Sequence, residues 1–211
     1  NVIAELDWCV GELVRTLEQR GLLDNTLIVF SSDNGAVVDD GYQDEAVAKL
    51  GSHRPNGHLR GGKYSNFEGG TRVPFIVHWP ARVKPAVSDA LVSQVDLLRS
   101  FAQLTGAELA PGAGPDSENV LGALLGESKK GRQLLVEQAT VLSLRDGTWK
   151  YVSPGKGPKV QVNTNTETGN DPEPQLYDLS ADIGETKNLA AQHPARVKEA
   201  AEKLQKIRTT S

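Results

Sequence analysis

The first residues of the chain show apolar positions at helical spacing, followed by a short continuous apolar run. Steps of three and four residues join the apolar positions between residues 2 and 20, which predicts an amphipathic helix that ends at Gly21. The run at 26–30 is apolar and β-rich, as expected for a parallel strand covered on both faces. A helix, a short turn and a buried strand together predict half of a doubly wound α/β unit.

The middle of the chain combines a long glycine-rich loop with one more strand and one more helix. Residues 31–72 are rich in glycine and hold only a short helix-like patch at 44–50. A strand is predicted at 74–79 and an amphipathic helix at 92–104, ended by Gly106. Because loops this long are uncommon in compact domains and are usually functional, we expect 31–72 to carry a site.

The C-terminal part of the chain has the alternation that is typical of short antiparallel strands. The segments with this pattern are 132–137, 141–145, 148–152 and 175–179. Asp146-Gly147 predicts a tight hairpin, the polar segment 154–174 predicts a surface loop, and a helix is predicted from Pro194 to residue 207. We therefore predict two domains, 1–130 and 131–211, of which the second is a small antiparallel subdomain.

Composition narrows the class of protein. Apolar residues make up 38% of the chain and charged residues 24%, which suits a globular domain. No apolar run approaches the roughly 18 residues of a membrane span, and a net charge of −4 without a basic block argues against a nucleic-acid partner. The single Cys9 excludes an internal disulfide. A start at Asn1, within a helical pattern and without a signal peptide, predicts a piece of a longer protein.

Two segments carry candidate chemistry. Asp33-Asn34-Gly35 follows the first strand, at the edge where open α/β sheets bind ligands, and its carboxylate and amide oxygens suit a hard cation. The alternative is a turn in which these side chains only cap the backbone. Lys63, after two glycines, is a compact cation suited to an oxyanion; the alternative is a solvated loop charge. His53 and Arg60 are candidate substrate contacts, while Glu68 and Arg72 are expected to pair with each other.

These segments, in this order and ahead of the 74–79 strand, resemble the sulfatase family of the alkaline-phosphatase superfamily. Further motifs that carry the resemblance are 6–11, 21–26 (GLLDNT), 96–98, 104–106, 145–151 (RDGTWKY), 176–179 and 185–189 (ETKNL). The resemblance implies that residues 1–130 are the closing part of a mainly parallel sheet flanked by helices. Residues 131–211 would be its small antiparallel sheet with the C-terminal helix.

The resemblance also implies an activity. It implies a sulfuric ester hydrolase that uses one divalent cation, commonly Ca²⁺, held in part by Asp33 and Asn34, with Lys63 on the substrate sulfate. The family's nucleophile is a formylglycine made within a C/S-x-P/A-x-R motif, which is missing here; Cys9 lies in a helical pattern and does not match it. The nucleophile is therefore expected upstream, and the chain alone is expected to be inactive.

Two alternatives stay open. A phosphodiesterase or phosphonate hydrolase of the same superfamily would carry histidine where Asn34 stands, since imidazole binds zinc or manganese. A non-catalytic binding fragment is the other alternative. The expected partners are a sulfated small molecule or glycan, a carbohydrate sulfate being favoured, and the missing N-terminal part of the same protein. A periplasmic or secreted location is expected from the resemblance alone.

Overall fold

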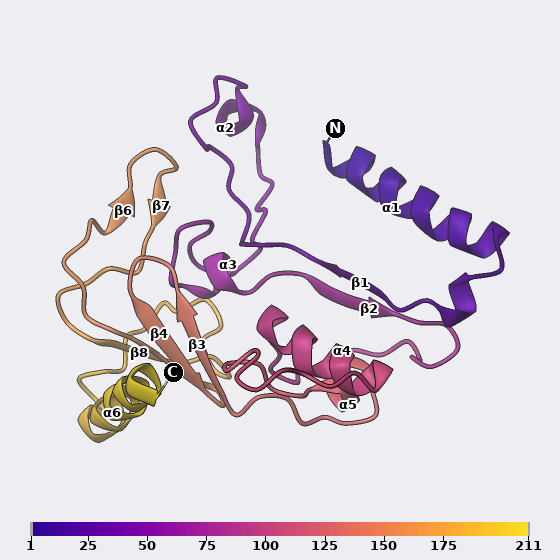
Figure 1. Cartoon of the computed structure of the whole chain (residues 1–211). Helices are drawn as coiled ribbons and strands as arrows, with labels where there is room; N and C mark the ends of the chain where they lie inside the picture. The colour runs from indigo at the N-terminus through magenta and orange to yellow at the C-terminus, as the bar shows by residue number, and fades with distance from the viewer. Residues whose placement is uncertain (1, 211) are drawn as a thin grey trace. The chain divides into compact units, whose positions relative to one another are not determined.

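The computed structural model describes residues 2–210 and divides into two compact units (Figure 1). The first unit comprises the residues up to 31 together with 75–131, and the second comprises 32–74 together with the residues from 132 onward. This grouping places the glycine-rich loop with the C-terminal residues. One reason for this grouping is the buried side chain of Asn66, whose Oδ1 accepts from the Thr140 and Val141 N–H groups and whose Nδ2 donates to the Val141 carbonyl. The division into domains 1–130 and 131–211 stays a prediction.

The first unit is mainly helical. Its elements are α1 (Val2–Gln19), η1 (Leu23–Asn25), β1 (Ile28–Ser31), β2 (Phe75–His78), η2 (Gln94–Asp96), α4 (Leu97–Thr105) and α5 (Leu121–Leu124). The predicted helices at 2–20 and 92–104 are confirmed, although the second begins as a 3₁₀ turn. Gly106 ends α4 with a φ of 70°, a left-handed conformation that glycine adopts at little cost.

The two strands of this unit run in opposite directions. Ile28 pairs with His78 and Ser31 with Phe75, in antiparallel register. The parallel arrangement expected for the 26–30 strand is therefore not the one that this pair adopts. A continuous apolar run reports burial and not direction; here the chain leaves β1 at Ser31 and returns at Phe75 beside it, which requires an antiparallel pair.

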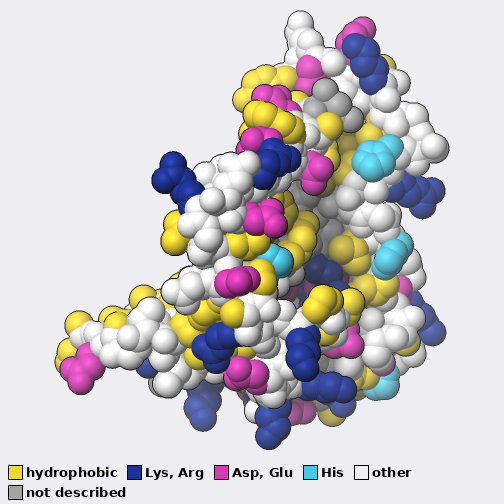
Figure 2. Space-filling model, turned by 90° about the vertical axis from the view of Figure 1, so that its right-hand side faces the viewer, with side chains coloured by type: hydrophobic (Ala, Val, Ile, Leu, Met, Phe, Trp, Pro, Cys, Tyr) yellow, Lys and Arg dark blue, Asp and Glu magenta, His cyan; other side chains and the backbone are white. Residues whose placement is uncertain are grey.

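Helix α1 has no fully buried residue, and several of its apolar side chains are exposed. Val2 is 79% exposed, Ile3 71% and Trp8 62%, and Cys9 is exposed as well. The face shown in Figure 2 also exposes other hydrophobic side chains. Acidic and basic side chains are interspersed among them. Within residues 2–210, no helix is both long and apolar enough to cross a membrane.

The second unit is built on a four-stranded antiparallel sheet in the order β3-β4-β5-β8. Its elements are α2 (Ala46–Lys49), α3 (Glu68–Thr71), β3 (Leu134–Gln138), β4 (Leu142–Asp146), β5 (Trp149–Val152), β6 (Val160–Gln161), β7 (Thr166–Glu167), β8 (Gln175–Asp178) and α6 (Pro194–Thr210). The predicted hairpin is confirmed, with Asp146 paired to Trp149 and Gly147 at a φ of 60°. The predicted strands and the C-terminal helix are confirmed as well.

Most of the segment 154–174 is exposed, as its polarity predicts, but a part of it is ordered and buried. It forms the β6–β7 hairpin, and Thr168 and Asn170 are buried. The Thr168 hydroxyl donates to the Pro158 carbonyl at 2.6 Å, and its backbone carbonyl accepts from the Asn66 N–H at 2.9 Å. Polar residues can be buried here because their hydrogen bonds are made within the protein.

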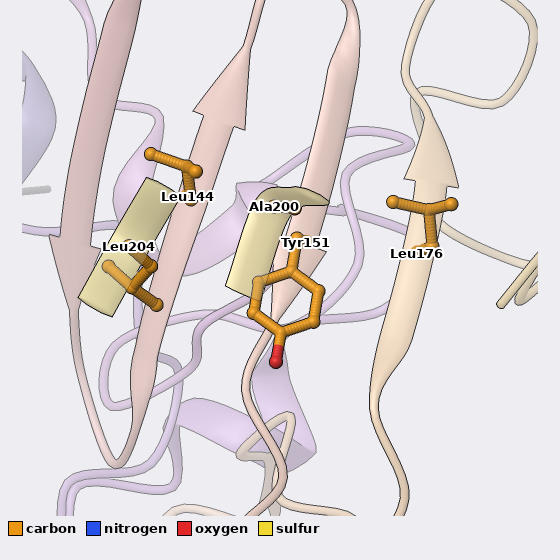
Figure 3. Packing of buried hydrophobic residues seen from close by; sticks show 5 residues of the cluster. All are labelled: Leu144, Tyr151, Leu176, Ala200 and Leu204. Atoms are coloured by element: carbon orange, nitrogen blue, oxygen red, sulfur yellow. The ribbon is translucent and has the colours of Figure 1, made fainter. Parts of the chain in front are cut away.

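The sheet separates two apolar clusters. On one face, Leu144, Tyr151 and Leu176 pack against Ala200 and Leu204 of α6 (Figure 3). On the other face, the next residues along the strands, Val152 and Tyr177, contact Phe67. Because Phe67 belongs to the glycine-rich loop, this second cluster holds the loop against the sheet, with the Phe67 and Tyr177 rings edge to face at 6.0 Å.

Candidate functional site

The Asp33-Asn34-Gly35 turn packs by its backbone against the glycine-rich loop. The Gly35 N–H donates to the Gly70 carbonyl at 2.9 Å. A Cβ on Gly35 would overlap the carbonyl oxygen of Gly69, so only glycine allows this close approach. The two segments that the sequence singled out, 33–35 and the loop around Lys63, are therefore brought together.

Asn56, which no pattern in the sequence singles out, adds hydrogen bonds to this junction. Its Oδ1 accepts from the Ala36 N–H at 3.0 Å, and its Nδ2 donates to the carbonyls of Ala36 and Gly61, each at 3.1 Å. The Lys63 N–H in turn donates to the Ala36 carbonyl at 3.3 Å. A single amide thus connects the residue that follows Gly35 to the residues that precede Lys63.

Asp33 and Asn34 offer oxygens that suit a cation. The Asn34 Nδ2 donates to the Gly35 carbonyl at 2.9 Å, which fixes the amide with its Oδ1 on the other side. The Asp33 side chain is exposed, and no donor among residues 2–210 contacts its carboxylate. The donor set fits a hard cation, but two oxygens are only part of a coordination sphere. Among these residues, no group of three or more His, Cys, Asp or Glu could hold a metal ion.

Lys63 is half-buried and forms an ion pair. Its Nζ lies 2.9 Å from the Asp40 Oδ2, and the Tyr64 hydroxyl donates to the other Asp40 oxygen at 3.3 Å. The hydrogen bond with Asp40 raises the pKa of Lys63, and the same bond lowers the pKa of Asp40. Tyr64 has a φ of 76°, a conformation that costs energy in a non-glycine residue and fixes the turn just after the lysine.

The two candidate substrate contacts differ in their surroundings. His53 is exposed in the loop. The Arg60 guanidinium binds the Glu167 carboxylate with two hydrogen bonds, of 2.8 and 2.9 Å, and donates to the Glu185 carbonyl at 2.7 Å. It also lies 4.0 Å from the centre of the Phe67 ring. These contacts make Arg60 part of the framework of the loop.

Glu68, in the glycine-rich loop, belongs to a cluster of charged side chains that we call the buried ion cluster. Its members are Glu68, Glu137, Glu185, Lys150, Arg72 and Arg145. The predicted pairing of Glu68 with Arg72 is confirmed at 2.7 Å, but the Glu68 carboxylate also accepts from the fully buried Lys150 at 2.9 Å. Sequence reasoning missed Lys150; the one signal was a lysine between aromatic residues in a predicted strand.

The charges in the buried ion cluster shift one another's pKa values. Burial on its own would raise the pKa of Glu68, but Lys150, Arg72 and Arg145 lower it overall. Burial raises the pKa of Glu185 to about 7, because Lys150 offsets only part of the desolvation. Burial on its own would lower the pKa of Lys150, but the three surrounding carboxylates raise it overall.

Comparisons with protein families and with known proteins all identify sulfatases as the relatives of this chain. The family model Sulfatase matches residues 1–107. The N-acetylgalactosamine-6-O-sulfatase of Bacteroides thetaiotaomicron is 48% identical over 211 residues, which cover 99% of this chain and 41% of that protein. Arylsulfatase A of Homo sapiens is 34% identical over 203 residues, covering 89% of this chain and 38% of that protein. The chain therefore spans about two fifths of the length of these relatives.

Solved structures show the same likeness. One solved structure comes from work on the metabolism of multiple glycosaminoglycans by Bacteroides thetaiotaomicron. It matches with a TM-score of 0.96 at 48% identity, covering 99% of this chain and 44% of that chain. A sulfatase from Pseudoalteromonas sp. matches with a TM-score of 0.77 at 25% identity, covering 99% of this chain and 42% of that one. The predicted fold class, part of an alkaline-phosphatase-like α/β fold with a small antiparallel sheet and a C-terminal helix, is confirmed.

Proposed function

We propose that this chain, which belongs to the sulfatase family, is part of an enzyme that hydrolyses a sulfate ester of a carbohydrate. The observation that supports the proposal is the junction of the Asp33-Asn34 turn with the loop of Lys63, the segments that carry the proposed cation ligands and the proposed oxyanion-binding ammonium. The 48% identity to an N-acetylgalactosamine-6-O-sulfatase supports a 6-O-sulfated amino sugar as the substrate.

Asp33 and Asn34 are proposed to bind a divalent cation, and we propose that this cation is Ca²⁺. A carboxylate and an amide oxygen are hard ligands, and an amide in place of an imidazole disfavours the zinc or manganese of related phosphatases. When bound, the cation supplies positive charge to the sulfate oxygens. Gly35 and Asn56 keep the two ligands beside the lysine loop, which we define as residues 60–68.

Lys63 is proposed to bind the sulfate group. An ammonium has three N–H donors, and Asp40 accepts from one of them, so two remain for sulfate oxygens. Charge that develops on these oxygens during S–O cleavage would be stabilised by a cation that is already in place. Asp40 and Tyr64 fix the ammonium before the substrate arrives, which reduces the cost of ordering it.

Part of the active site is proposed to come from outside these residues. The sequence holds no C/S-x-P/A-x-R motif, so the formylglycine nucleophile and the remaining cation ligands would be contributed by the rest of a longer protein. The same segment would cover the exposed apolar side chains of α1, since exposed apolar surface of this kind marks an interface. A location outside the cytoplasm is proposed from the family likeness alone.

The activity is tested with the full-length protein and two matched substrates. We expect release of sulfate from 6-O-sulfated N-acetylgalactosamine in the presence of Ca²⁺, and at least a hundredfold lower kcat/KM for a phosphodiester of the same leaving group. A preference for the phosphodiester, with zinc or manganese as the activating ion, would support the phosphodiesterase alternative. Turnover of neither substrate would support a binding role.

A further inference from the structure

The lysine loop closes on itself, so its two ends determine where Lys63 lies. The Gly69 N–H donates to the Arg60 carbonyl at 2.8 Å, and the Ser65 N–H donates to the Gly62 carbonyl at 2.9 Å. A Cβ on Gly69 would lie 2.6 Å from the Gly61 carbonyl oxygen, which shows how closely the ends approach. A displacement of either end would therefore be transmitted to the Lys63 turn.

The first end is held through the side chain of Arg60. Three of its five N–H donors are used, two by Glu167 and one by the backbone carbonyl of Glu185. The guanidinium also covers the Phe67 ring inside the loop. Glu167 and Glu185 both lie in the C-terminal residues, more than one hundred positions along the chain from Arg60.

The second end is held through Glu68. Its backbone N–H donates to the Glu185 carboxylate at 2.6 Å, and its own carboxylate accepts from Lys150. Glu185 thus contacts both ends of the loop, with its carbonyl on Arg60 and its side chain on Glu68. Glu185 is fully buried and has a φ of 51°, a left-handed conformation that the surrounding contacts must maintain.

We propose that Glu185 is a positioning residue for the sulfate-binding Lys63. It acts by fixing both ends of the lysine loop, through its contacts with Arg60 and Glu68. This inference rests on the proposed function only for the role of Lys63, since the contacts of the loop stand independently of it. It also assigns a task to the C-terminal residues, which otherwise contribute no side chain to the proposed site.

The test compares variants of the full-length protein by kinetics and by amide hydrogen exchange. Glu185→Ala removes the acceptor for the Glu68 N–H, and we expect kcat/KM to fall about 10- to 100-fold, because misplacement of a binding group by about 1 Å can cost 10²-fold. Glu185→Gln keeps an acceptor oxygen and is expected to stay within about threefold of the wild type. Glu137→Ala is the matched control, because Glu137 also contacts Lys150, at 3.5 Å, and forms no hydrogen bond or ion pair with the lysine loop among residues 2–210.

The double variant Glu185→Ala/Lys63→Ala distinguishes positioning of Lys63 from a general structural role of Glu185. If Glu185 acts through Lys63, Glu185→Ala lowers kcat/KM less than about threefold further in the Lys63→Ala protein; an undiminished loss there would overturn the proposal. Should Glu185→Ala not fold, Arg60→Lys, which breaks the paired hydrogen bonds to Glu167, is compared in the same way.

Hydrogen exchange decides the inference even if the protein has no sulfatase activity. We expect Glu185→Ala to speed exchange of the Ser65 and Gly69 amides at least tenfold, with no such change in Glu137→Ala. Exchange at wild-type rates in Glu185→Ala would overturn the positioning role. An inactive wild-type protein whose exchange responds as expected would instead overturn the proposed function and leave the positioning of the loop supported.

Discussion

Replacing Lys150 by methionine removes the ammonium from the buried ion cluster and keeps most of the side-chain volume. Lys150 is fully buried, 2.9 Å from Glu68 and 3.5 Å from both Glu137 and Glu185. Glu68 retains Arg72 and Arg145 as partners, whereas Glu185 loses its only cation among the described residues. Breaking a buried pair by removing one partner costs about 3–5 kcal/mol, so the free energy of unfolding at pH 8 should fall by that amount.

The same substitution should make stability depend on pH. Burial already raises the pKa of Glu185 to about 7, and the loss of Lys150 raises it further. A carboxyl group whose folded pKa exceeds its unfolded pKa adds stability at low pH, and this stability is lost as the pH rises through the folded value. The deficit of Lys150→Met should therefore be smaller at pH 5 than at pH 8.

Urea unfolding followed by tryptophan fluorescence at both pH values measures this effect, because Trp149 adjoins Lys150 on β5. Lys159→Met is the control: Lys159 pairs with Asp171 at 2.6 Å but is 68% exposed, so a change below about 1 kcal/mol is expected. A loss below 1 kcal/mol for Lys150→Met at pH 8, equal to that at pH 5, would refute the assignment of a charged, buried cluster.

Three further changes test the site in the full-length protein. Gly35→Ala should destabilise by about 1–3 kcal/mol or more, because its Cβ would overlap a backbone carbonyl; an unchanged unfolding midpoint would contradict the close packing. Asp33→Ala should weaken Ca²⁺ binding at least tenfold by calorimetry, while unchanged affinity would leave the segment as a turn only. Asp40→Asn should lower the pKa of Lys63, so the alkaline limb of the kcat/KM profile should move to lower pH; an unmoved limb would show that Asp40 does not act on Lys63.

The features that the sequence predicts best are those that neighbouring residues decide. The Asp146-Gly147 hairpin and the end of α4 at Gly106 depend on glycine's access to positive φ, which acts within a turn. The helix from Pro194 follows from a local pattern in the same way. The glycines and the lysine of the lysine loop are also visible without any knowledge of the fold, and its role as a site stays a prediction.

Partners that lie far apart in the chain were not predictable. Arg60 is a candidate substrate contact because it flanks Lys63 in the long loop, but its pairing with Glu167, 107 positions away, has no local signal. Lys150 and Glu68 are 82 positions apart, and neither residue identifies the other from local pattern. Thr168 is buried although the polarity of its segment predicts exposure, because its backbone carbonyl accepts from the N–H of Asn66 in the distant glycine-rich loop.

The most direct measurement is the kcat/KM of Lys63→Ala in the full-length protein, on 6-O-sulfated N-acetylgalactosamine at saturating Ca²⁺. A sulfate-binding Lys63 predicts a fall of about 10²–10³-fold, roughly 2.7–4 kcal/mol, as for the loss of one oxyanion donor. Lys159→Ala, which removes another lysine paired with an aspartate, should stay within about twofold. A Lys63→Ala protein that also stays within twofold of the wild type would contradict the assignment of this loop to the sulfate group.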